Sequence, residues 1–438
     1  MVISGTEQSP NFTGQGPVIE YAIKMIEFPQ EALFDYLLAN QKIPVAIIEL
    51  LGKKIAAFHQ QAKIVDGNSR FGTPEQVFAP VSQNFTQIRP LLKDKKDLDQ
   101  LAQLETLATQ QYQTLKPVLQ ARKDQGFIRE CHGDLHLKNI VLLHNQPVIF
   151  DCIEFNEDFR WTDTLADAGF LAMDFADNKR ADYAHRFINT YMAYSGDYSG
   201  LTLLRFYMAY RAMVRAKVAL FRLTQPDLSS EEQSATVNKY RSCTQLVEAM
   251  MHSSKSALII MHGYSGSGKS SWAKQIVDQY GAIQIRSDIE RKRLFNLAPE
   301  SASHSALNAH IYSPEATEKT AAHIESLTKN VLTAGYLVII DATFIKKNQR
   351  IRAQQMAKEL KVPFVIVECQ APYETLKRHI VERQEYKSDP SEARLEVLEW
   401  QQTEMEALSP EERQHTVTID ITKSPDPKTV FQQLDALL

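Results

Sequence analysis

The sequence predicts two parts: a mainly helical α+β first part and an α/β second part built on a doubly wound parallel sheet. Helical periodicity of apolar residues dominates residues 30–125 and 163–251. Later in the chain, short apolar runs alternate with helical patterns, which is typical of a parallel sheet covered by helices on both faces. The short polar segment at 252–256 separates the two patterns. We therefore expect domains at 1–252 and 253–438.

The chain has the composition and charge of an ordinary globular protein. It contains 438 residues, 44% of them hydrophobic and 23% charged, with a formal net charge of −4. A net negative charge gives no general attraction to nucleic acid or to an anionic membrane, so we expect neither as a partner. Four scattered cysteines without C-x-x-C spacing, and an amino terminus without a signal-peptide pattern, predict a cytoplasmic protein with reduced thiols. The sequence leaves the oligomeric state open.

Two strand regions are expected within the helical first part. Residues 18–25 alternate between apolar and polar side chains after a turn-rich segment, as a strand does. Two apolar runs at 140–143 and 147–150 flank polar residues, and this arrangement predicts a β-hairpin. In the second part we expect five strands, at residues 257–261, 282–285, 337–340, 363–367 and 416–419.

The strongest functional motif follows the first strand of the second part. Residues 261–271 match every defined position of the pattern G-x-x-x-x-G-K-[ST], whose backbone N–H groups surround a phosphate at the start of a helix. We expect Lys269 to reach the β- and γ-phosphates of ATP and Ser270 to hold Mg²⁺. The expected nucleotide-binding residues are Gly263, Tyr264, Ser265, Gly266, Ser267, Gly268, Lys269, Ser270 and Ser271.

Two carboxylates lie where other strands of the expected sheet end. Asp341 follows the strand at 337–340, where a Mg²⁺–nucleotide site needs a second metal anchor, although it could instead cap the next turn. Asp288 is expected beside the phosphate loop and could accept a proton from an attacking hydroxyl, with or without serving as a helix N-cap. Arg291, in the basic cluster that follows, could hold an anionic substrate.

A charged helix at 373–383 and a polar loop at 384–390 predict a lid over this site. Such a lid would deliver arginines to the transferring phosphoryl group. Arg383, next to the loop, is the first candidate. Arg378 is the second, although it fits an ordinary surface helix equally well.

Together these residues resemble the small P-loop kinases, often described as AAA-family ATPases, that include gluconate kinase, the 5′-polynucleotide kinase domain and zeta toxins. The resemblance implies that the second part phosphorylates a hydroxyl group with ATP and Mg²⁺. The matching positions are residues 261–271, Ser287, Asp288, Arg291, residues 341–343 and Arg383.

The first part carries a second constellation of polar residues. Asp134 is followed five positions later by Asn139, and Asp151 comes after the expected hairpin. A tight loop can bring the three side chains together, with Asp134 taking a proton from an acceptor hydroxyl while Asn139 and Asp151 coordinate Mg²⁺ on ATP. Taken singly, each aspartate could equally be a turn or cap residue.

The pattern His-Gly-Asp at 132–134, with Asn139, resembles the aminoglycoside phosphotransferase and choline kinase branch of the protein-kinase-like fold. The helix that ends at His59 also fits this branch, as do Asp163 and Asp167, which we interpret as structural caps. The resemblance implies a protein-kinase-like C-lobe. Its N-lobe is expected to be truncated, because little chain precedes it.

Lys24 imitates the nucleotide-binding lysine of such an N-lobe, but its position suits a hinge strand expected near residues 19–29. The N-lobe lysine is therefore expected to be absent. The chain is then either a shortened form of a longer protein or one with a catalytically impaired first part. The order of the two parts also resembles a two-domain bacterial family that joins a phosphotransferase-like domain to a P-loop kinase-like domain.

The leading functional hypothesis is an ATP-dependent phosphotransferase that transfers the γ-phosphate to a hydroxyl of a small molecule. The second part would hold the main ATP site, with Lys269, Asp288 and Arg383 as catalytic residues, and Asp134 would be the catalytic residue of the first part. The alternatives are a pseudokinase that controls a P-loop nucleotide switch, and a 5′-OH nucleic-acid end kinase. The acidic balance and the lack of interleaved aromatic and basic residues disfavour the end kinase.

Overall fold

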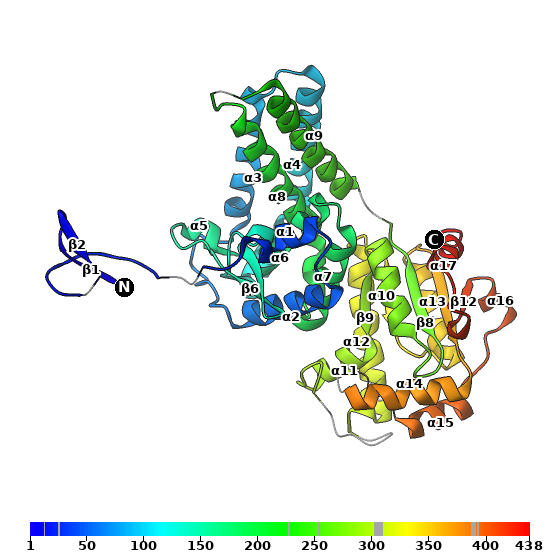
Figure 1. The fold of residues 1–438 in the computed structure, drawn as a ribbon. Helices are drawn as coiled ribbons and strands as arrows, with labels where there is room; N and C mark the ends of the chain where they lie inside the picture. Colours follow the sequence, from blue (N-terminus) through cyan, green and yellow to red (C-terminus); the bar gives the residue numbers. More distant parts are fainter. Residues whose placement is uncertain are drawn as a thin grey trace.

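The computed structural model describes residues 1–12, 14–24, 27–226, 228–252, 255–301, 310–386, 391 and 394–438. Figure 1 shows two bodies side by side, which we call the first body (residues 30–252) and the second body (residues 255–438), and a small sheet that projects from the first. Within the described residues, no helix is both long enough and apolar enough to cross a membrane.

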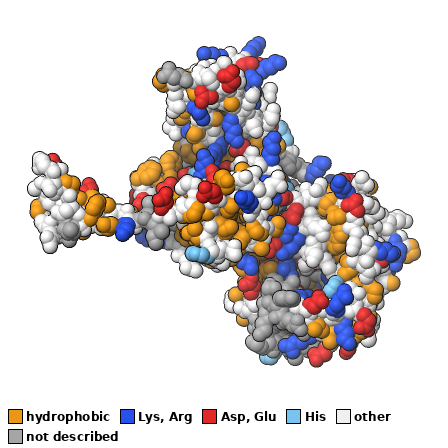
Figure 2. Space-filling view, viewed as in Figure 1, with side chains coloured by type: hydrophobic (Ala, Val, Ile, Leu, Met, Phe, Trp, Pro, Cys, Tyr) orange, Lys and Arg blue, Asp and Glu red, His pale blue; other side chains and the backbone are white. Residues whose placement is uncertain are grey.

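The projecting amino-terminal segment is a small antiparallel sheet in the order β2-β1-β3. Figure 2 shows exposed apolar side chains on it, and Phe12, Val18 and Tyr21 are among the exposed residues. The sequence predicted a strand over 18–25 but missed β1 and β2, because their residues form part of a turn-rich segment. The three strands are β1 (Val2–Thr6), β2 (Ser9–Asn11) and β3 (Val18–Tyr21).

The hinge strand expected near residues 19–29 stays a prediction. The strand at this place, β3, pairs with β1 inside the small sheet. Lys24 lies beyond β3 and is exposed, while Met25 and Ile26 lie outside the described residues.

The first body is mainly helical, as its apolar periodicity predicts. The closest helix pairs are α8 with α9, α2 with α7, and α6 with α8, so α6 to α9 form its centre. Its helices are α1 (Phe34–Ala39), α2 (Val45–Gln61), α3 (Pro74–Ile88), α4 (Lys95–Asp124), α5 (Glu157–Arg160), α6 (Thr164–Asp177), α7 (Ala181–Ser195), α8 (Leu201–Arg222) and α9 (Ser230–His252).

Two small antiparallel strand pairs lie at one side of these helices. The predicted hairpin is confirmed as β5 (Ile140–Leu143) and β6 (Gln146–Ile149), which pair directly. Its turn residues His144 and Asn145 have φ angles of 49° and 58°, as a tight two-residue hairpin turn requires. The second pair, β4 (Ile128–Glu130) with β7 (Trp161–Asp163), was not expected from the sequence.

The second body contains a five-stranded parallel sheet in the order β12-β11-β8-β10-β9. All five predicted strands are confirmed, with ends that differ by one or a few residues. The strands are β8 (Leu258–His262), β9 (Ile283–Arg286), β10 (Val338–Asp341), β11 (Phe364–Gln370) and β12 (Thr416–Asp420).

Helices cover both faces of this sheet, which confirms the doubly wound arrangement. Leu258 and Ile260 of β8 pack toward α12 (Pro314–Thr333) and α13 (Lys347–Glu359), whereas Ile259 and Met261 pack toward α10 (Lys269–Tyr280) and α17 (Pro427–Asp435). This alternation follows from the two-residue repeat of a strand. The remaining helices are α11 (Ser287–Leu294), α14 (Tyr373–Tyr386), α15 (Leu395–Glu404) and α16 (Pro410–Arg413).

The two bodies share one hydrophobic core. The cluster that fills the first body continues into the sheet face under α12 and α13. At the boundary, α7 packs on α10 and on β9, and Arg186 of α7 forms ion pairs with Asp278 of α10 and Glu49 of α2. The change from helices to alternating strands falls between His252 and Leu258, near the expected boundary. The division into separate domains stays a prediction, because the polar segment divides the chain but not the core.

Candidate functional site

The predicted phosphate loop lies at the carboxyl edge of the parallel sheet, where loops from neighbouring strands meet. A cavity of about 910 Å³ opens beside it. Its walls come from the loop, from the ends of β9 and β10, and from α12, α13, α14 and α15. The predicted residues that line it include Lys269, Ser270, Asp288, Asp341 and Arg383. The fold thus gathers into one cavity residues that are far apart in the sequence.

The loop conformation depends on glycine. Gly266 and Gly268 have φ angles of 83° and 80°, in the left-handed region that side-chain-bearing residues rarely adopt. Helix α10 begins at Lys269, directly after Gly268. The first N–H groups of a helix have no partner within the helix, so this positive helix end faces the cavity that Lys269 and Ser270 line. An anion is the ligand that such an end attracts.

The structure divides the predicted nucleotide-binding residues into three groups. Gly263 and Tyr264 line a separate hollow on the other side of the loop, together with Glu368. Ser267 is buried, and its hydroxyl is one of the buried polar atoms that lack a hydrogen-bond partner within the described part of the chain. The predicted loop residues that line the main cavity are Ser265, Gly266, Gly268, Lys269, Ser270 and Ser271.

Two residues that the sequence analysis missed hold the loop in place. Gln401 of α15 accepts a hydrogen bond from the backbone N–H of Ser265 at 2.8 Å and donates to the Ser265 hydroxyl at 3.0 Å. His379 of α14 lies with Nδ1 2.9 Å from the carbonyl oxygen of Gly266. No motif indicates either residue, because both reach the loop only when α14 and α15 fold back across it.

Lys269 is buried and turned toward its own loop. Its ammonium group donates to the carbonyl oxygens of Gly263 at 3.0 Å and Tyr264 at 2.6 Å. Burial is the largest cause that lowers the pKa of Lys269 below its usual value; the nearby charge of Arg383 acts in the same direction, and Asp341 and Asp288 oppose it. The charges of Arg383, Asp341 and Asp288 therefore all act on Lys269.

The carboxylate of Asp341 is buried at the end of β10. Its Oδ2 accepts a hydrogen bond from the side-chain amide of Gln284 at 2.8 Å and lies 3.6 Å from Nε of Arg286. Asp341 and Ser270 both offer oxygen ligands to the same cavity, and oxygen is the donor that Mg²⁺ prefers. The residues present therefore fit a Mg²⁺–nucleotide complex.

Asp288 lies in the first turn of α11 and lines the cavity. The N-cap of α11 is Arg286, so Asp288 does not serve as the N-cap of this helix. Burial raises the pKa of the Asp288 carboxyl above its ordinary value, although the positive charges of Arg286 and Arg291 oppose this effect. A carboxylate with a raised pKa is a stronger base.

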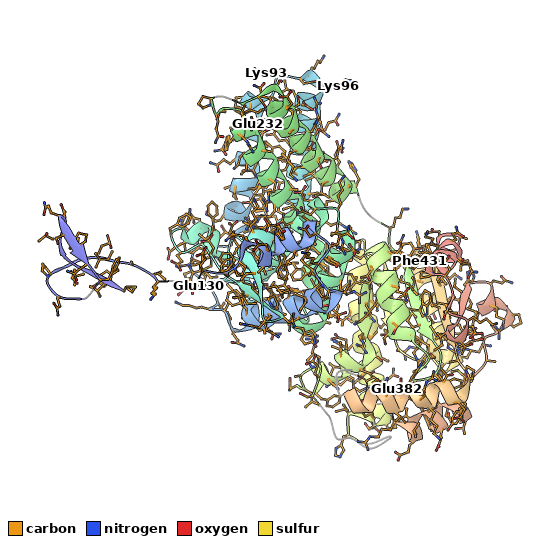
Figure 3. The ribbon with its side chains drawn as sticks, in the orientation of Figure 1. Lys93, Lys96, Glu130, Glu232, Glu382 and Phe431 are labelled. Atoms are coloured by element: carbon orange, nitrogen blue, oxygen red, sulfur yellow. The ribbon has the colours of Figure 1, made fainter. Side chains whose placement is uncertain are left out.

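The three arginines that the sequence singled out lie in different environments. Arg383 lines the cavity. Arg291 also lines it, but it donates to the carbonyl oxygen of Ile311 at 2.8 Å and to the Thr317 hydroxyl at 3.2 Å, so it is tied to the start of α12. Arg378 is exposed and faces Glu382, which Figure 3 labels on α14. Of the expected lid loop, residues 387–390 lie outside the described residues.

In the first body, the structure brings Asp134 and Asn139 together. The side-chain amide of Asn139 donates to the backbone carbonyl of Asp134 at 3.1 Å and to its carboxylate at 3.4 Å. Partial burial raises the pKa of Asp134, but the hydrogen bond and charge of His136, with the charge of Arg211, outweigh it, so the pKa lies below its ordinary value. Asp151 follows β6, is exposed and has a left-handed φ of 60°.

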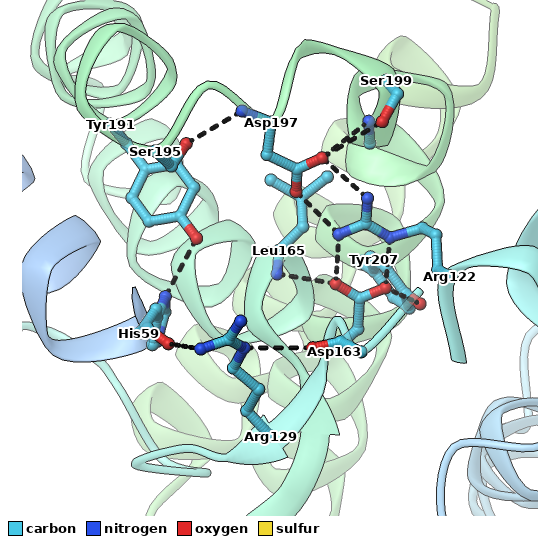
Figure 4. A network of polar contacts seen from close by, with 12 residues as sticks. His59, Arg122, Arg129, Asp163, Leu165, Tyr191, Ser195, Asp197, Ser199 and Tyr207 are labelled. Atoms are coloured by element: carbon cyan, nitrogen blue, oxygen red, sulfur yellow. Dashed lines mark hydrogen bonds and ion pairs between the residues drawn. The ribbon is translucent and has the colours of Figure 1, made fainter. Parts of the chain in front are cut away.

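Asp163 and Asp167 have different roles, and only Asp163 is a cap. Asp163 accepts from the backbone N–H of Leu165 at the start of α6 and also pairs with the buried Arg122 (Figure 4). Asp167 lies inside α6, fully buried, and accepts hydrogen bonds from the backbone N–H groups of His132 at 3.2 Å and Gly133 at 2.9 Å. Asp167 therefore fixes the loop that carries Asp134.

Comparisons with known proteins identify two family matches along the chain. Residues 25–204 match the family described as phosphotransferase enzyme family, and residues 258–408 match the family described as AAA domain. The chain thus combines a phosphotransferase-like part with a P-loop kinase-like part, in the order that the sequence predicted. These matches support a kinase-like phosphotransferase with a P-loop that binds nucleotides.

Individual relatives cover most of the chain or one of its parts. An uncharacterized protein of Mycobacterium tuberculosis strain H37Rv is 27% identical over 347 residues, which are 78% of this chain and 68% of the relative. A gluconokinase structure from Sinorhizobium meliloti is 19% identical and covers 38% of this chain and 82% of its own, with a TM-score of 0.27. The ethanolamine kinase structure of Plasmodium vivax is 11% identical and covers 51% of this chain and 63% of its own, with a TM-score of 0.34.

Proposed function

We propose that this protein is an ATP-dependent kinase that transfers the γ-phosphate to a hydroxyl group of a small molecule, with the cavity of the second body as its active site. The single observation that carries the proposal is the convergence of Lys269, Asp288, Asp341 and Arg383 on one cavity beside a glycine-dependent phosphate loop. Each of these side chains has the chemistry that in-line phosphoryl transfer needs.

The loop and the start of α10 bind the phosphates of ATP. Lys269 exchanges its hydrogen bonds to Gly263 and Tyr264 for bonds to the β- and γ-phosphates, so its ammonium group stays compensated. Ser270 and Asp341 would hold Mg²⁺, which would supply positive charge to the phosphate oxygens. Arg383 stabilises the charge that spreads over the transferring group.

Asp288 accepts the proton of the acceptor hydroxyl. The acceptor oxygen forms the new bond to the γ-phosphorus while the bond from that phosphorus to the β–γ bridging oxygen breaks, and ADP leaves. Its raised pKa makes the Asp288 carboxylate a better proton acceptor than an ordinary aspartate.

The proposal is tested with the full chain, by measuring ATP consumption against a panel of sugars, aminoglycosides, choline-like alcohols and 5′-OH oligonucleotides. Lys269→Ala is expected to abolish turnover, whereas Asp134→Ala is expected to retain most of it. Loss of all turnover in Asp134→Ala, with turnover retained in Lys269→Ala, would overturn the assignment of the active site to the second body.

A further inference from the structure

Two sets of buried polar contacts, both of which include a residue of α7, lie between the two candidate sites. The first set begins at the loop of the first body that carries Asp134. Asp167 accepts hydrogen bonds from the backbone N–H groups of His132 and Gly133 in this loop. Nε2 of His59 lies 3.1 Å from the Asp167 carboxylate, and since a carboxylate only accepts, His59 donates there.

The second ring nitrogen of His59 extends the contacts to α7. Nδ1 of His59 lies 3.0 Å from the hydroxyl of Tyr191, and Figure 4 shows this contact. His59, Asp167 and Tyr191 are all buried. Buried polar groups that lose a partner are costly, so the arrangement of this group is tightly determined. The orientation of α7 is therefore coupled to the position of the Asp134 loop.

On the same helix, Asn189 binds the edge strand of the second body. Its side-chain oxygen accepts from the backbone N–H of Gln284 at 2.7 Å, and its amide nitrogen donates to the backbone carbonyl of Ala282 at 2.8 Å. Strand β9 is at the edge of the sheet, so Asn189 supplies the donor and the acceptor that a further strand would supply. The first body thus completes the hydrogen bonding of β9.

The side chain of Gln284 carries the connection into the proposed active site. While its backbone N–H is held by Asn189, its side-chain amide donates to Oδ2 of Asp341 at 2.8 Å. Asp341 is the carboxylate proposed above to hold Mg²⁺. A hydrogen bond to one carboxylate oxygen orients the group and leaves the other oxygen toward the metal.

A second, independent contact from the first body holds the helix that carries Asp288. Tyr198, just after α7, donates its hydroxyl to Glu290 of α11 at 3.1 Å. Glu290 is fully buried and also accepts a hydrogen bond from Nε of Arg293 at 3.0 Å. Nε2 of His323 lies 3.2 Å from the same carboxylate. Both ends of the β9–α11 connection are therefore fixed by side chains of the first body.

We propose that Asn189 and Gln284 are positioning residues that couple the Asp134 loop of the first body to Mg²⁺ binding at Asp341 in the second. The inference rests on the proposed function, because it concerns the Mg²⁺–nucleotide complex of that site. The first body acts as a regulatory part: a change of the loop at 132–134 shifts α7, and α7 alters how Gln284 orients Asp341. Removing partners of metal-binding side chains typically lowers metal affinity by about 10–100-fold.

A purely structural role for Asn189 predicts a different outcome. If the two hydrogen bonds of Asn189 only protect an edge strand, their loss lowers the stability of the chain but leaves the effect of Mg²⁺ on nucleotide affinity unchanged. The informative quantity is therefore the ADP dissociation constant without Mg²⁺ divided by the ADP dissociation constant with Mg²⁺, which we call the Mg²⁺ ratio. Calorimetry on the full-length chain measures both constants.

Three variants interrupt the contacts at successive points: Gln284→Met, Asn189→Leu and Tyr191→Phe. We expect Gln284→Met to reduce the Mg²⁺ ratio by about ten-fold, and Asn189→Leu and Tyr191→Phe to reduce it by about five-fold. ADP affinity without Mg²⁺ is expected to stay unchanged in all three. The matched control is Tyr194→Phe, on the same helix, which removes a hydroxyl contact to the exposed Glu300 and is expected to leave the ratio unchanged.

Two further readouts separate coupling from local damage. Amide hydrogen exchange of residues 282–288 is expected to be faster in Tyr191→Phe than in Tyr194→Phe, because of these two tyrosines Tyr191 is the one that contacts the buried pair of His59 and Asp167. The ratio in the double variant Tyr191→Phe with Gln284→Met is expected to fall by less than the product of the single effects.

The possible outcomes distinguish this inference from the proposed function. Absence of ADP binding by the wild-type chain would overturn the proposed function, and the inference with it. ADP binding by the wild-type chain with the same Mg²⁺ ratio in Tyr191→Phe and Asn189→Leu would overturn the inference alone.

Discussion

The two candidate sites each contain an aspartate that the sequence predicts to act as a base, but the surroundings shift the two pKa values in opposite directions. Burial raises the pKa of Asp288 despite the charges of Arg286 and Arg291. Burial acts in the same sense on Asp134, but His136, whose Nε2 lies 3.2 Å from Oδ2 of Asp134, outweighs it and lowers the pKa. A similar motif chemistry thus produces a stronger base in the second body and a weaker one in the first.

The two sites also differ in how their predicted residues are gathered. In the second body, residues from the loop, β9, β10 and α14 line one cavity. In the first body, Asp134 and Asn139 are in contact, whereas Asp151 is exposed beyond the hairpin. The comparison teaches that the second site gathers its predicted residues around one cavity, while the first is organised around the buried Asp167 that fixes its loop.

The sharpest test of this comparison replaces each candidate base in turn. Asp288→Asn keeps the size of the side chain but removes the proton acceptor, so turnover with an accepted alcohol is expected to fall by about 10²–10⁴-fold. Asp134→Asn is expected to leave turnover nearly unchanged. Initial rates of ADP formation measure both, and equal losses in the two variants would contradict the ranking of the sites.

A second large effect concerns the stability of the first body. Arg122 is buried and pairs with both Asp163 and Asp197. Arg122→Met leaves two buried carboxylates without their cation, and we expect a loss of about 3–5 kcal/mol in the free energy of unfolding. Denaturant melts measure this loss. Arg378→Met, at an exposed ion pair, serves as the control and is expected to change stability by less than about 0.5 kcal/mol.

The pH dependence of turnover sharpens the comparison further. In the proposed mechanism, turnover requires the deprotonated form of Asp288, so the rate is expected to fall as the pH drops through the pKa of this group. Because that pKa is raised, the acid limb of the rate profile is expected at a higher pH than an ordinary aspartate would produce. A profile of ATP turnover against pH measures it. Asp134→Asn is expected to leave the limb in place, and a limb that moves in this variant would contradict the assignment.

The smallest expected effect tests the cause of the lowered pKa of Asp134. His136→Gln removes the imidazole ring whose Nε2 lies 3.2 Å from Oδ2 of Asp134, so the pKa of Asp134 is expected to rise toward its ordinary value. Carboxyl carbon NMR of labelled full-length chain, titrated with acid, reports this pKa. The control is His144→Gln, in the hairpin turn. An unchanged pKa of Asp134 in His136→Gln would show that another group lowers the pKa of Asp134.

Much of this architecture could be predicted because it depends on local patterns. Five apolar runs correspond to β8 to β12, and helical periodicity predicts the long helices of the first body. The G-x-x-x-x-G-K-[ST] spacing predicts a loop that requires glycine, and Gly266 and Gly268 have left-handed φ angles. The five-residue spacing of Asp134 and Asn139 likewise predicts their contact. Each of these features follows from the order of neighbouring residues, which limits the backbone conformation and the buried face.

Only the tertiary structure determined the partners of these predicted residues. Gln401 holds Ser265 across a separation of 136 residues, and Asn189 binds the backbone of Gln284 across 95. The contact of Gln284 with Asp341 and the role of Asp167 below the Asp134 loop are of the same kind. Such pairs have no periodicity or spacing in the sequence, because two polar groups become partners only when the packing of whole helices and strands removes both from water.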